Sequence, residues 1–155
     1  MWKSCIRDLR RQHDADLKVY RLAHQEWRNR VIHWVMIPIE CWSAFLLVVV
    51  IVPPFVFVSI GLGLGVVALL ISTNENVGWY CLLFHIAAVG SCLAITQLLC
   101  VLQTVSLGFI SWTIAWLCQV GIGHRLWENN RPNVADIHTV SFLAMIESVL
   151  IAWSS

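Results

Sequence analysis

The chain has 155 residues, of which 59% are hydrophobic and 12% charged, with a net charge of +1 and a mean hydropathy of +0.74. Soluble domains usually carry about 25% charged residues, and the near-zero net charge gives no sign of a nucleic-acid partner. From Val31 to His124 there is no lysine or arginine, and the only acids are Glu40 and Glu75. This excludes a soluble domain and indicates an integral membrane protein, because a charge at the bilayer centre costs roughly 2.5–3.5 kcal/mol.

Residues 1–31 form a polar region that contains all but two of the ten lysines and arginines. The spacing predicts an amphipathic helix over residues 5–28, which packs against the bundle or lies in the membrane interface. One face of this helix carries apolar and aromatic side chains at three- and four-residue steps: Leu9, His13, Leu17, Tyr20, His24 and Trp27. By the positive-inside rule, region 1–31 is expected in the cytosol.

Residues 32–127 contain four long apolar segments, each near the roughly 20 residues that a membrane-spanning helix needs. The segments are about 32–52, 55–72, 77–102 and 104–127. Residues 128–138 are polar and predict a cytosolic loop, and 139–153 form a short apolar segment. That segment is a fifth span, a re-entrant piece or an interfacial helix, and its length favours the last two. The expected fold is a single all-α membrane bundle over residues 1–155, in which four crossings return residues 124–138 to the side of residues 24–33.

The start of the first apolar segment carries Tyr20, His24, Asn29 and His33. In one continuous helix, His24 and His33 would point in opposite directions, because nine residues correspond to about two and a half turns. As an N-cap, Asn29 would separate two helices, put His33 in the first turn of the second, and allow both imidazoles to meet. The alternative is that His24 is exposed and His33 reaches for water at the interface.

The end of the fourth apolar segment carries Gly121, Gly123, His124, Glu128 and Pro132. His124 and Glu128 are four residues apart, so they share one face of an α-helix, and this is a spacing by which helices present two metal ligands. The two glycines allow a neighbouring helix to come close. The alternative is a hydrogen-bonded pair at a helix end.

Within the apolar segments, Glu40 lies two helical turns after His33 on the same face, with Pro38 between them. Buried ionisable residues in membranes are functional candidates, so Glu40 is either functional or a structural hydrogen-bond partner. For His85 a structural hydrogen bond between helices is favoured. The sequence Gly61-x-Gly63-x-Gly65 has no preceding strand and predicts a helix-packing face rather than a dinucleotide-binding loop.

Together, two motifs resemble the fungal 2-hydroxy-fatty-acid dioxygenase family. They are Tyr20-x3-His24-x4-Asn29-x3-His33-x4-Pro38 and Gly123-His124-x3-Glu128-x3-Pro132-x3-Asp136. The resemblance implies an endoplasmic-reticulum enzyme that uses Fe(II) and O2 to remove one carbon from 2-hydroxy long-chain fatty acids, as in sphingoid-base breakdown. It also implies that His24, His33 and His124 bind the iron, and Glu128 matches the acid of the family pattern.

Histidines with a carboxylate suit non-haem iron and leave positions open for O2 and substrate. A 2-hydroxy acid could chelate the iron through its carboxylate and hydroxyl, with its alkyl chain between apolar helices. Candidate catalytic acids are Glu128, Asp136 and Glu40. Candidate substrate-binding residues are Tyr20 and Asn29, with Arg28, Arg30, Arg125 and Arg131 as basic groups that would attract the carboxylate.

The chain departs from the family pattern at several positions. Gln25 stands where a second histidine is common, Trp27 replaces a proline and Asn133 replaces an alanine. The glutamine before Gly-His, Gln119, is displaced by one residue. His138 matches no family position but could replace a missing ligand.

Two other functions remain open on the same scaffold. The first is a metal-independent lyase or cyclase acting on a terpenoid or another lipid, with Glu40, Glu128 or Asp136 as the acid and aromatic side chains stabilising cations. The second is a non-enzymatic membrane scaffold. The sequence does not separate iron from zinc, because imidazole binds both.

Overall fold

The computed structural model describes residues 2–23, 26–72 and 74–128, and within these ranges the chain is helical with no strand. In chain order the elements are α1 (Trp2–Ala23), α2 (Trp27–Val49), α3 (Pro54–Ile71), α4 (Glu75–Leu98), α5 (Val101–Leu117) and the π-helix η1 (Cys118–Glu128). This confirms the all-α fold. The loop expected at 128–138 and the short apolar segment expected at 139–153 lie outside the described residues from position 129 onward.

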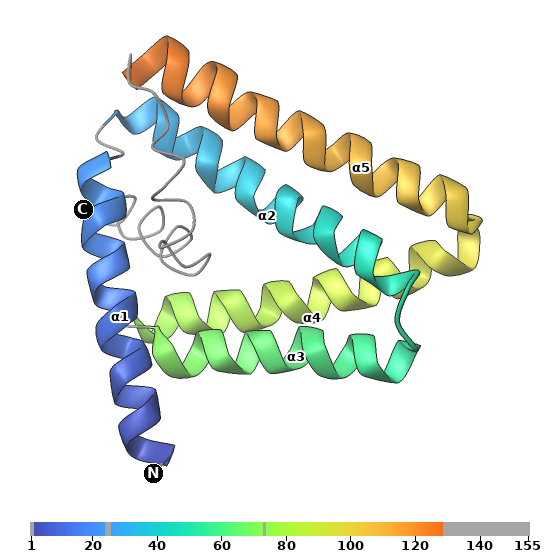
Figure 1. Ribbon diagram of the computed structural model, residues 1–155, viewed down its shortest axis with the longest axis horizontal. Coiled ribbons are helices and arrows are strands. Elements are labelled where there is room, and N and C mark those ends of the chain that lie inside the picture. Colours follow the sequence, from blue (N-terminus) through green and yellow to red (C-terminus); the bar gives the residue numbers. More distant parts are fainter. Residues whose placement is uncertain (1, 24–25, 73, 129–155) are drawn as a thin grey trace.

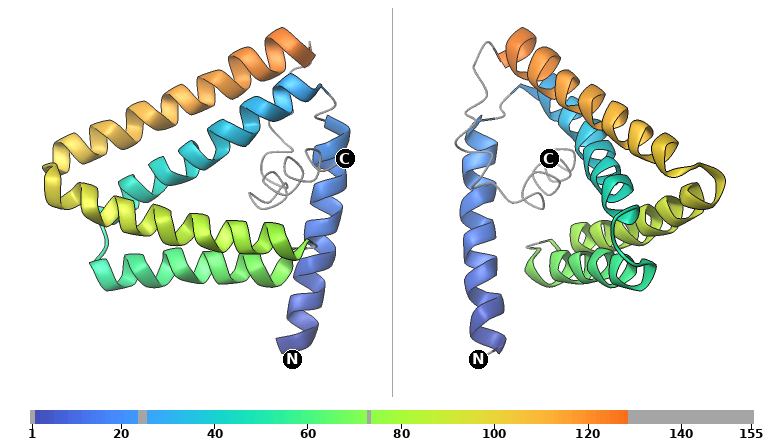
Figure 2. Two further views of the ribbon diagram at one scale, coloured as in Figure 1. Left: turned by 180° about the vertical axis from the view of Figure 1, so that it is seen from behind. Right: turned by 45° about the vertical axis from the view of Figure 1, so that its right-hand side comes forward.

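The helices form two antiparallel pairs, α2 beside α5–η1 and α3 beside α4 (Figures 1 and 2). The pairs meet at the end that holds the α2–α3 and α4–α5 connections, and they diverge toward the other end. Among the described residues, four helical stretches are long and apolar enough to cross a membrane: Trp27–Val49, Pro54–Ile71, Glu75–Leu98 and Val101–Trp127. The start of α2 and the end of η1 therefore lie at the same end of an integral membrane bundle, as the even number of crossings predicts.

The break between α1 and α2 lies earlier than expected. α1 ends at Ala23, so the prediction of one helix to residue 28 is wrong at its C-terminal end. Asn29 is not the N-cap of α2; that residue is Glu26, whose carboxylate accepts a hydrogen bond from Arg28 N at 3.4 Å and whose carbonyl accepts one from Arg30 N at 3.2 Å. A carboxylate suits this position because it satisfies an orphan N–H at the positive end of the helix dipole. Asn29 and His33 thus lie in the first and second turns of α2.

The other helix starts have local chemical causes. Pro54 is the first residue of α3, where its missing N–H costs nothing. Asn74 caps α4 by accepting hydrogen bonds from the backbone of Asn76 and Val77, and Glu75 lies in the first turn, where the helix dipole favours its charge. α4 ends at Leu98 and α5 begins at Val101, so the break expected near residue 103 comes a few residues earlier.

α1 crosses the end of the α3–α4 pair, nearly at right angles to both helices (Figures 1 and 2). The Arg10 guanidinium donates a hydrogen bond to the Leu70 carbonyl at 2.8 Å, near the C-terminus of α3. A cation is favourable there because the last carbonyls of a helix lack partners and carry the negative end of the dipole. His13, on the predicted apolar face of α1, is buried. α1 is therefore attached to the bundle by defined contacts.

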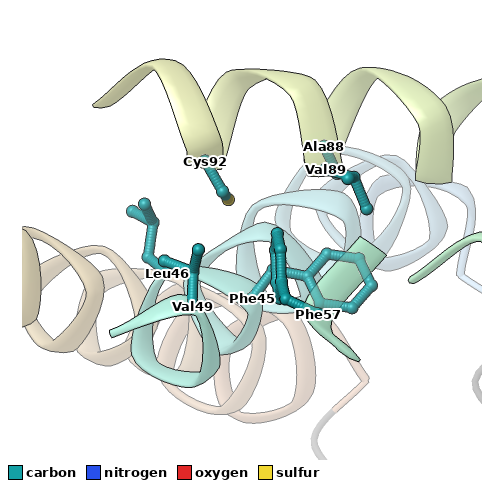
Figure 3. Packing of buried hydrophobic residues seen from close by; sticks show 7 residues of the cluster. All are labelled: Phe45, Leu46, Val49, Phe57, Ala88, Val89 and Cys92. Carbon is teal, nitrogen blue, oxygen red and sulfur yellow. The ribbon is translucent and has the colours of Figure 1, made fainter. Parts of the chain in front are cut away.

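The largest buried cluster joins the two helix pairs at the end where they converge (Figure 3). Phe45 of α2 meets Phe57 of α3 edge to face, with ring centroids 5.9 Å apart. The Trp42 indole of α2 donates a hydrogen bond to the Ser91 hydroxyl of α4 at 3.0 Å. The remaining members of the cluster are Leu46, Val49, Ala88, Val89 and Cys92. This core holds the two helix pairs together at the end where they converge. Within the described chain it does not extend to the opposite end, where α2 begins and η1 ends.

The glycine-rich stretch of α3 packs against α4, as predicted, but through two of its three glycines. A Cβ on Gly61 would overlap the Val89 side chain, and one on Gly65 would lie 3.0 Å from His85 Cβ. A Cβ on Gly63 would meet nothing within 4 Å. Gly61 and Gly65 are one helical turn apart and let the two helix backbones approach, whereas Gly63 faces outward.

We expect Gly61→Ala to lower the thermal unfolding midpoint in detergent, because overpacking typically costs about 1–3 kcal/mol. Gly63→Ala, the matched control, should leave the midpoint unchanged or raise it slightly, since alanine is the better helix former. Adding Val89→Ala to Gly61→Ala should recover part of the loss. Unfolding is followed by tryptophan fluorescence. Near-identical unfolding midpoints for Gly61→Ala and Gly63→Ala would contradict the assigned packing face.

Candidate functional site

His33 is held in the second turn of α2 with only 3% of its surface exposed. Its Nδ1 lies 2.9 Å from the Asn29 carbonyl oxygen, one turn earlier in the same helix. A carbonyl only accepts, so Nδ1 carries the proton and the neutral ring has its lone pair on Nε2. A backbone carbonyl that fixes the tautomer and the ring orientation is the usual partner of a metal-binding histidine.

His124 of η1 lies against His33. The two ring centroids are 5.1 Å apart and the ring planes make an angle of 83°. The two histidines at the margins of the stretch without lysine or arginine therefore meet, although they belong to the first and fourth membrane-spanning helices of the described chain. At this separation two imidazoles could share one metal ion.

The contact between α2 and η1 depends on Gly123. A Cβ at this position would overlap the Asn29 Oδ1 atom and would lie 3.2 Å from Asn29 Cγ and 3.5 Å from His33 Cε1. The same face of α5–η1 carries Ala115, fully buried, and Gly108, where a Cβ would lie 3.2 Å from the Ser43 carbonyl of α2. These small residues, spaced by about two turns, let the backbones approach. The sequence analysis identified Gly123 but missed Gly108 and Ala115.

The Asn29 side chain is fully buried beside Gly123. Neither its Oδ1 nor its Nδ2 has a hydrogen-bond partner within the described part of the chain. Leaving one buried polar group unsatisfied costs about 1–3 kcal/mol, and a role in catalysis and the binding of a water or an ion are among the explanations for such groups in native proteins. Asn29 thus provides both a donor and an acceptor next to His33, at a position where the sequence analysis expected a substrate-binding residue.

The segment that carries His124 winds as a π-helix rather than the α-helix assumed for His124 and Glu128. π-helices are rare and occur frequently at functional sites. Their hydrogen bonds run from i to i+5, so residues five apart return to the same face. The prediction of an α-helix around His124 is therefore wrong, while the expected sharing of one face by His124 and Glu128 stays a prediction, because the Glu128 side chain is not described. In this winding Gln119 and His124 are five residues apart. Glu128 is the last residue of η1.

Glu40 is paired with Gln119 across the α2–η1 contact. The Gln119 side-chain Nε2 donates a hydrogen bond to Glu40 Oε2 at 2.8 Å, and Gln119 is buried while Glu40 is half-buried. Glu40 lies two turns below His33 on α2, as expected from the sequence. Both residues are recognisable from the sequence, but their pairing is not, because they are 79 positions apart.

His85 lies in the packing between helices rather than beside His33. Its Nδ1 donates a hydrogen bond to the Cys81 carbonyl at 2.7 Å, within α4. Its ring meets Phe45 and Phe84 edge to face at 5.8 and 5.6 Å. These contacts fit the structural role favoured from sequence, with the hydrogen bond inside one helix instead of between two.

Several expected site residues lie outside what the structure describes. They are His24, Arg131, Asp136, His138 and the side chains of Tyr20 and Glu128. Among the basic candidates, Arg125 is exposed on η1, and Arg28 is exposed with its guanidinium 5.7 Å from the Trp27 ring. Over residues 2–23, 26–72 and 74–128, no group of three His, Cys, Asp or Glu side chains is close enough to hold a metal ion. The described site therefore consists of His33, His124 and Asn29, and the three-histidine ligand set stays a prediction.

These features define an all-helical integral membrane protein in which the first and fourth spans of the described chain bring two histidines together at one end of the bundle. The model of the family described as 2-hydroxy-palmitic acid dioxygenase Mpo1-like matches residues 11–153. The chain therefore belongs to this family, and the resemblance inferred from the two motifs is confirmed. No curated protein and no solved structure is significantly similar to the chain.

Proposed function

We propose that this protein is an Fe(II)-dependent dioxygenase that shortens 2-hydroxy long-chain fatty acids by one carbon. The observation that carries the proposal is the meeting of His33 and His124, with ring centroids 5.1 Å apart beside an unpartnered buried amide within the described chain. The family description names 2-hydroxy-palmitic acid as the substrate of a dioxygenase. We propose a cytosolic N-terminus, because eight of the ten lysines and arginines lie in residues 1–31. The endoplasmic reticulum is proposed from the family resemblance alone.

The residues of the site fit an iron ion. His33 and His124 would hold it, with His24 proposed as the third ligand and Glu128 as a neighbouring carboxylate. When bound, iron supplies the activation of O2. The Asn29 carbonyl keeps the His33 ring in one tautomer and one orientation through Nδ1. The Asn29 side chain offers a donor and an acceptor to the hydroxyl and carboxylate of the substrate, and Arg125 and Arg131 would attract that carboxylate.

The proposed reaction needs no reductant besides the substrate. R-CH(OH)-COOH and O2 give R-COOH, CO2 and H2O when the bond between C1 and C2 breaks. The two carbons lose four electrons together, and one O2 accepts four. A site at the end of a membrane bundle suits such a substrate, because the hydroxyl and carboxylate lie at one end of the fatty acid and the apolar chain makes up the rest. Each buried CH2 of the chain would add about 0.8 kcal/mol to binding.

The deciding experiment measures metal content and turnover of the full-length protein, purified anaerobically in detergent with Fe(II) supplied. We expect about one iron per chain by mass spectrometry, and almost none in the His33→Ala, His124→Ala double variant. With 2-hydroxypalmitate, O2 consumption should match formation of the C15 acid, and a chelator should stop it. Palmitate, which lacks the hydroxyl, should not react.

The other results point to the alternatives. Zinc in place of iron would keep the metal site but overturn the O2 chemistry. A metal-free protein that still converts a lipid would favour the lyase or cyclase with Glu40 or another acid. A metal-free protein with no lipid turnover would favour the scaffold.

A further inference from the structure

We propose that the hydrogen bond between Glu40 and Gln119 holds η1 in its π-helical register and so positions His124 against His33. Glu40 would be a positioning residue, since it acts on His124 through Gln119 and η1. The role of this bond for iron binding rests on the proposed function. Its effect on the winding of η1 does not.

The winding of η1 requires an external cause. π-helices are rare, and long ones more so, so contacts outside the helix must favour this form over the α-helix. η1 begins at Cys118, and Gln119 is its second residue. The bond to Glu40 therefore acts on the first turn of the π-helix, where the change from α-helical winding begins.

The environment makes this bond effective. Glu40 belongs to the membrane-spanning part of α2, and Gln119 is only 8% exposed. With no water to replace a lost partner, a carboxyl or amide group in this position is unfavourable unless it is hydrogen-bonded. Rotation of Gln119 away from Glu40 would leave both groups unsatisfied, so the pair resists a change of register.

The geometry of the helix shows why the register matters. In an α-helix each residue turns by about 100°, so a residue five positions later points about 140° away from the first. Gln119 and His124 could then not both face α2. In a π-helix they do, and the structure has Gln119 on Glu40 and His124 on His33 at the same time.

The test compares variants of Glu40 in the full-length protein. Glu40→Met removes the acceptor at similar volume, and Glu40→Gln keeps a hydrogen-bonding amide. The pair Glu40→Gln with Gln119→Glu exchanges the two groups. Gln97→Met, at an exposed position of α4, controls for the loss of a polar group in a membrane helix. The first readout is the distance between spin labels introduced as unnatural amino acids at Trp34 of α2 and Arg125 of η1, both exposed. The second is iron affinity.

We expect Glu40→Met to broaden and shift the label distance and to weaken iron binding at least tenfold. Glu40→Gln, the exchanged pair and Gln97→Met should stay close to the wild type. Deleting Gly121 from the Glu40→Met protein should restore the distance and iron binding, because an α-helix then presents residue 119 and the histidine four residues apart on one face. This rescue distinguishes loss of register from loss of fold.

A wild-type distance and iron affinity in Glu40→Met would overturn the inference, and so would failure of the Gly121 deletion to restore either. If the wild type binds no iron but Glu40→Met still shifts the label distance, the proposed function fails and the register role stands. If the wild type binds iron and the label distance is the same in Glu40→Met, the register role fails and the proposed function stands.

Discussion

Replacing Gly123 with alanine is expected to abolish iron binding and turnover, whereas Gly121→Ala should leave both within about twofold of the wild type. A Cβ at position 123 would overlap the Asn29 amide and press toward the His33 ring, while one at position 121 meets nothing within 4 Å. The Asn29 amide is fully buried against Gly123, so we expect the added methyl group to push η1 away from α2 and to separate His124 from His33. The strain should also reduce stability by about 1–3 kcal/mol.

The measurement is iron content, turnover and thermal unfolding of both alanine variants in the same detergent. Gly121 and Gly123 belong to the same π-helix, so the control carries the same change in helix propensity two residues away. Full iron content and turnover in Gly123→Ala would contradict a close approach of η1 to α2. Equal losses in both variants would mean that flexibility of the glycines, rather than space, is what the site needs.

Asn29→Leu is expected to raise stability and to abolish turnover. Leucine has the same branching as asparagine, and it removes two buried polar atoms that lack partners among the described residues. Relief of one unsatisfied group is worth about 1–3 kcal/mol. Turnover should fall at least a hundredfold, because a substrate hydroxyl or carboxylate would lose its hydrogen bonds with the amide.

A rise in stability together with a loss of turnover in Asn29→Leu would identify Asn29 as a functional residue. Thermal unfolding and turnover with 2-hydroxypalmitate are measured on the wild type, Asn29→Leu and Asn29→Asp. The aspartate keeps an acceptor but loses the donor and adds a charge in a buried place, so it should lower both stability and turnover. A parallel fall of stability and turnover in Asn29→Leu would instead make Asn29 a structural residue.

The sequence predicts the architecture well because hydrophobic segments and charge placement decide it. The absence of basic residues from 31 to 124 predicts the membrane bundle, and the even number of spans predicts that His33 and His124 lie at one end. The contact between His33 and His124 depends on two further features of the sequence. They are Gly123 beside His124 and the small residues Gly108 and Ala115 on the same face of α5–η1. Of these only the glycine was recognised.

The remaining features depend on tertiary contacts that no local pattern contains. Glu26 caps α2 although asparagine is the better N-cap residue, because Asn29 is buried against Gly123 inside the bundle. The π-helical winding of η1 follows from simultaneous contacts at Gln119 and Gly123, which α-helical periodicity cannot predict. The pairing of Glu40 with Gln119 joins residues far apart in sequence, and only the register of η1 against α2 brings them together.

The positions of the two histidines in the sequence determine when during synthesis they can come into contact. His33 emerges in the first described span and His124 at the end of the fourth, so the pair cannot form until α5 and η1 have been inserted. The proposed metal site can therefore form only after this fourth span is in place. A polypeptide divided between α3 and α4 would be inactive as either fragment, and co-expression of the two fragments would regain the site only if α5 and η1 dock back onto α2.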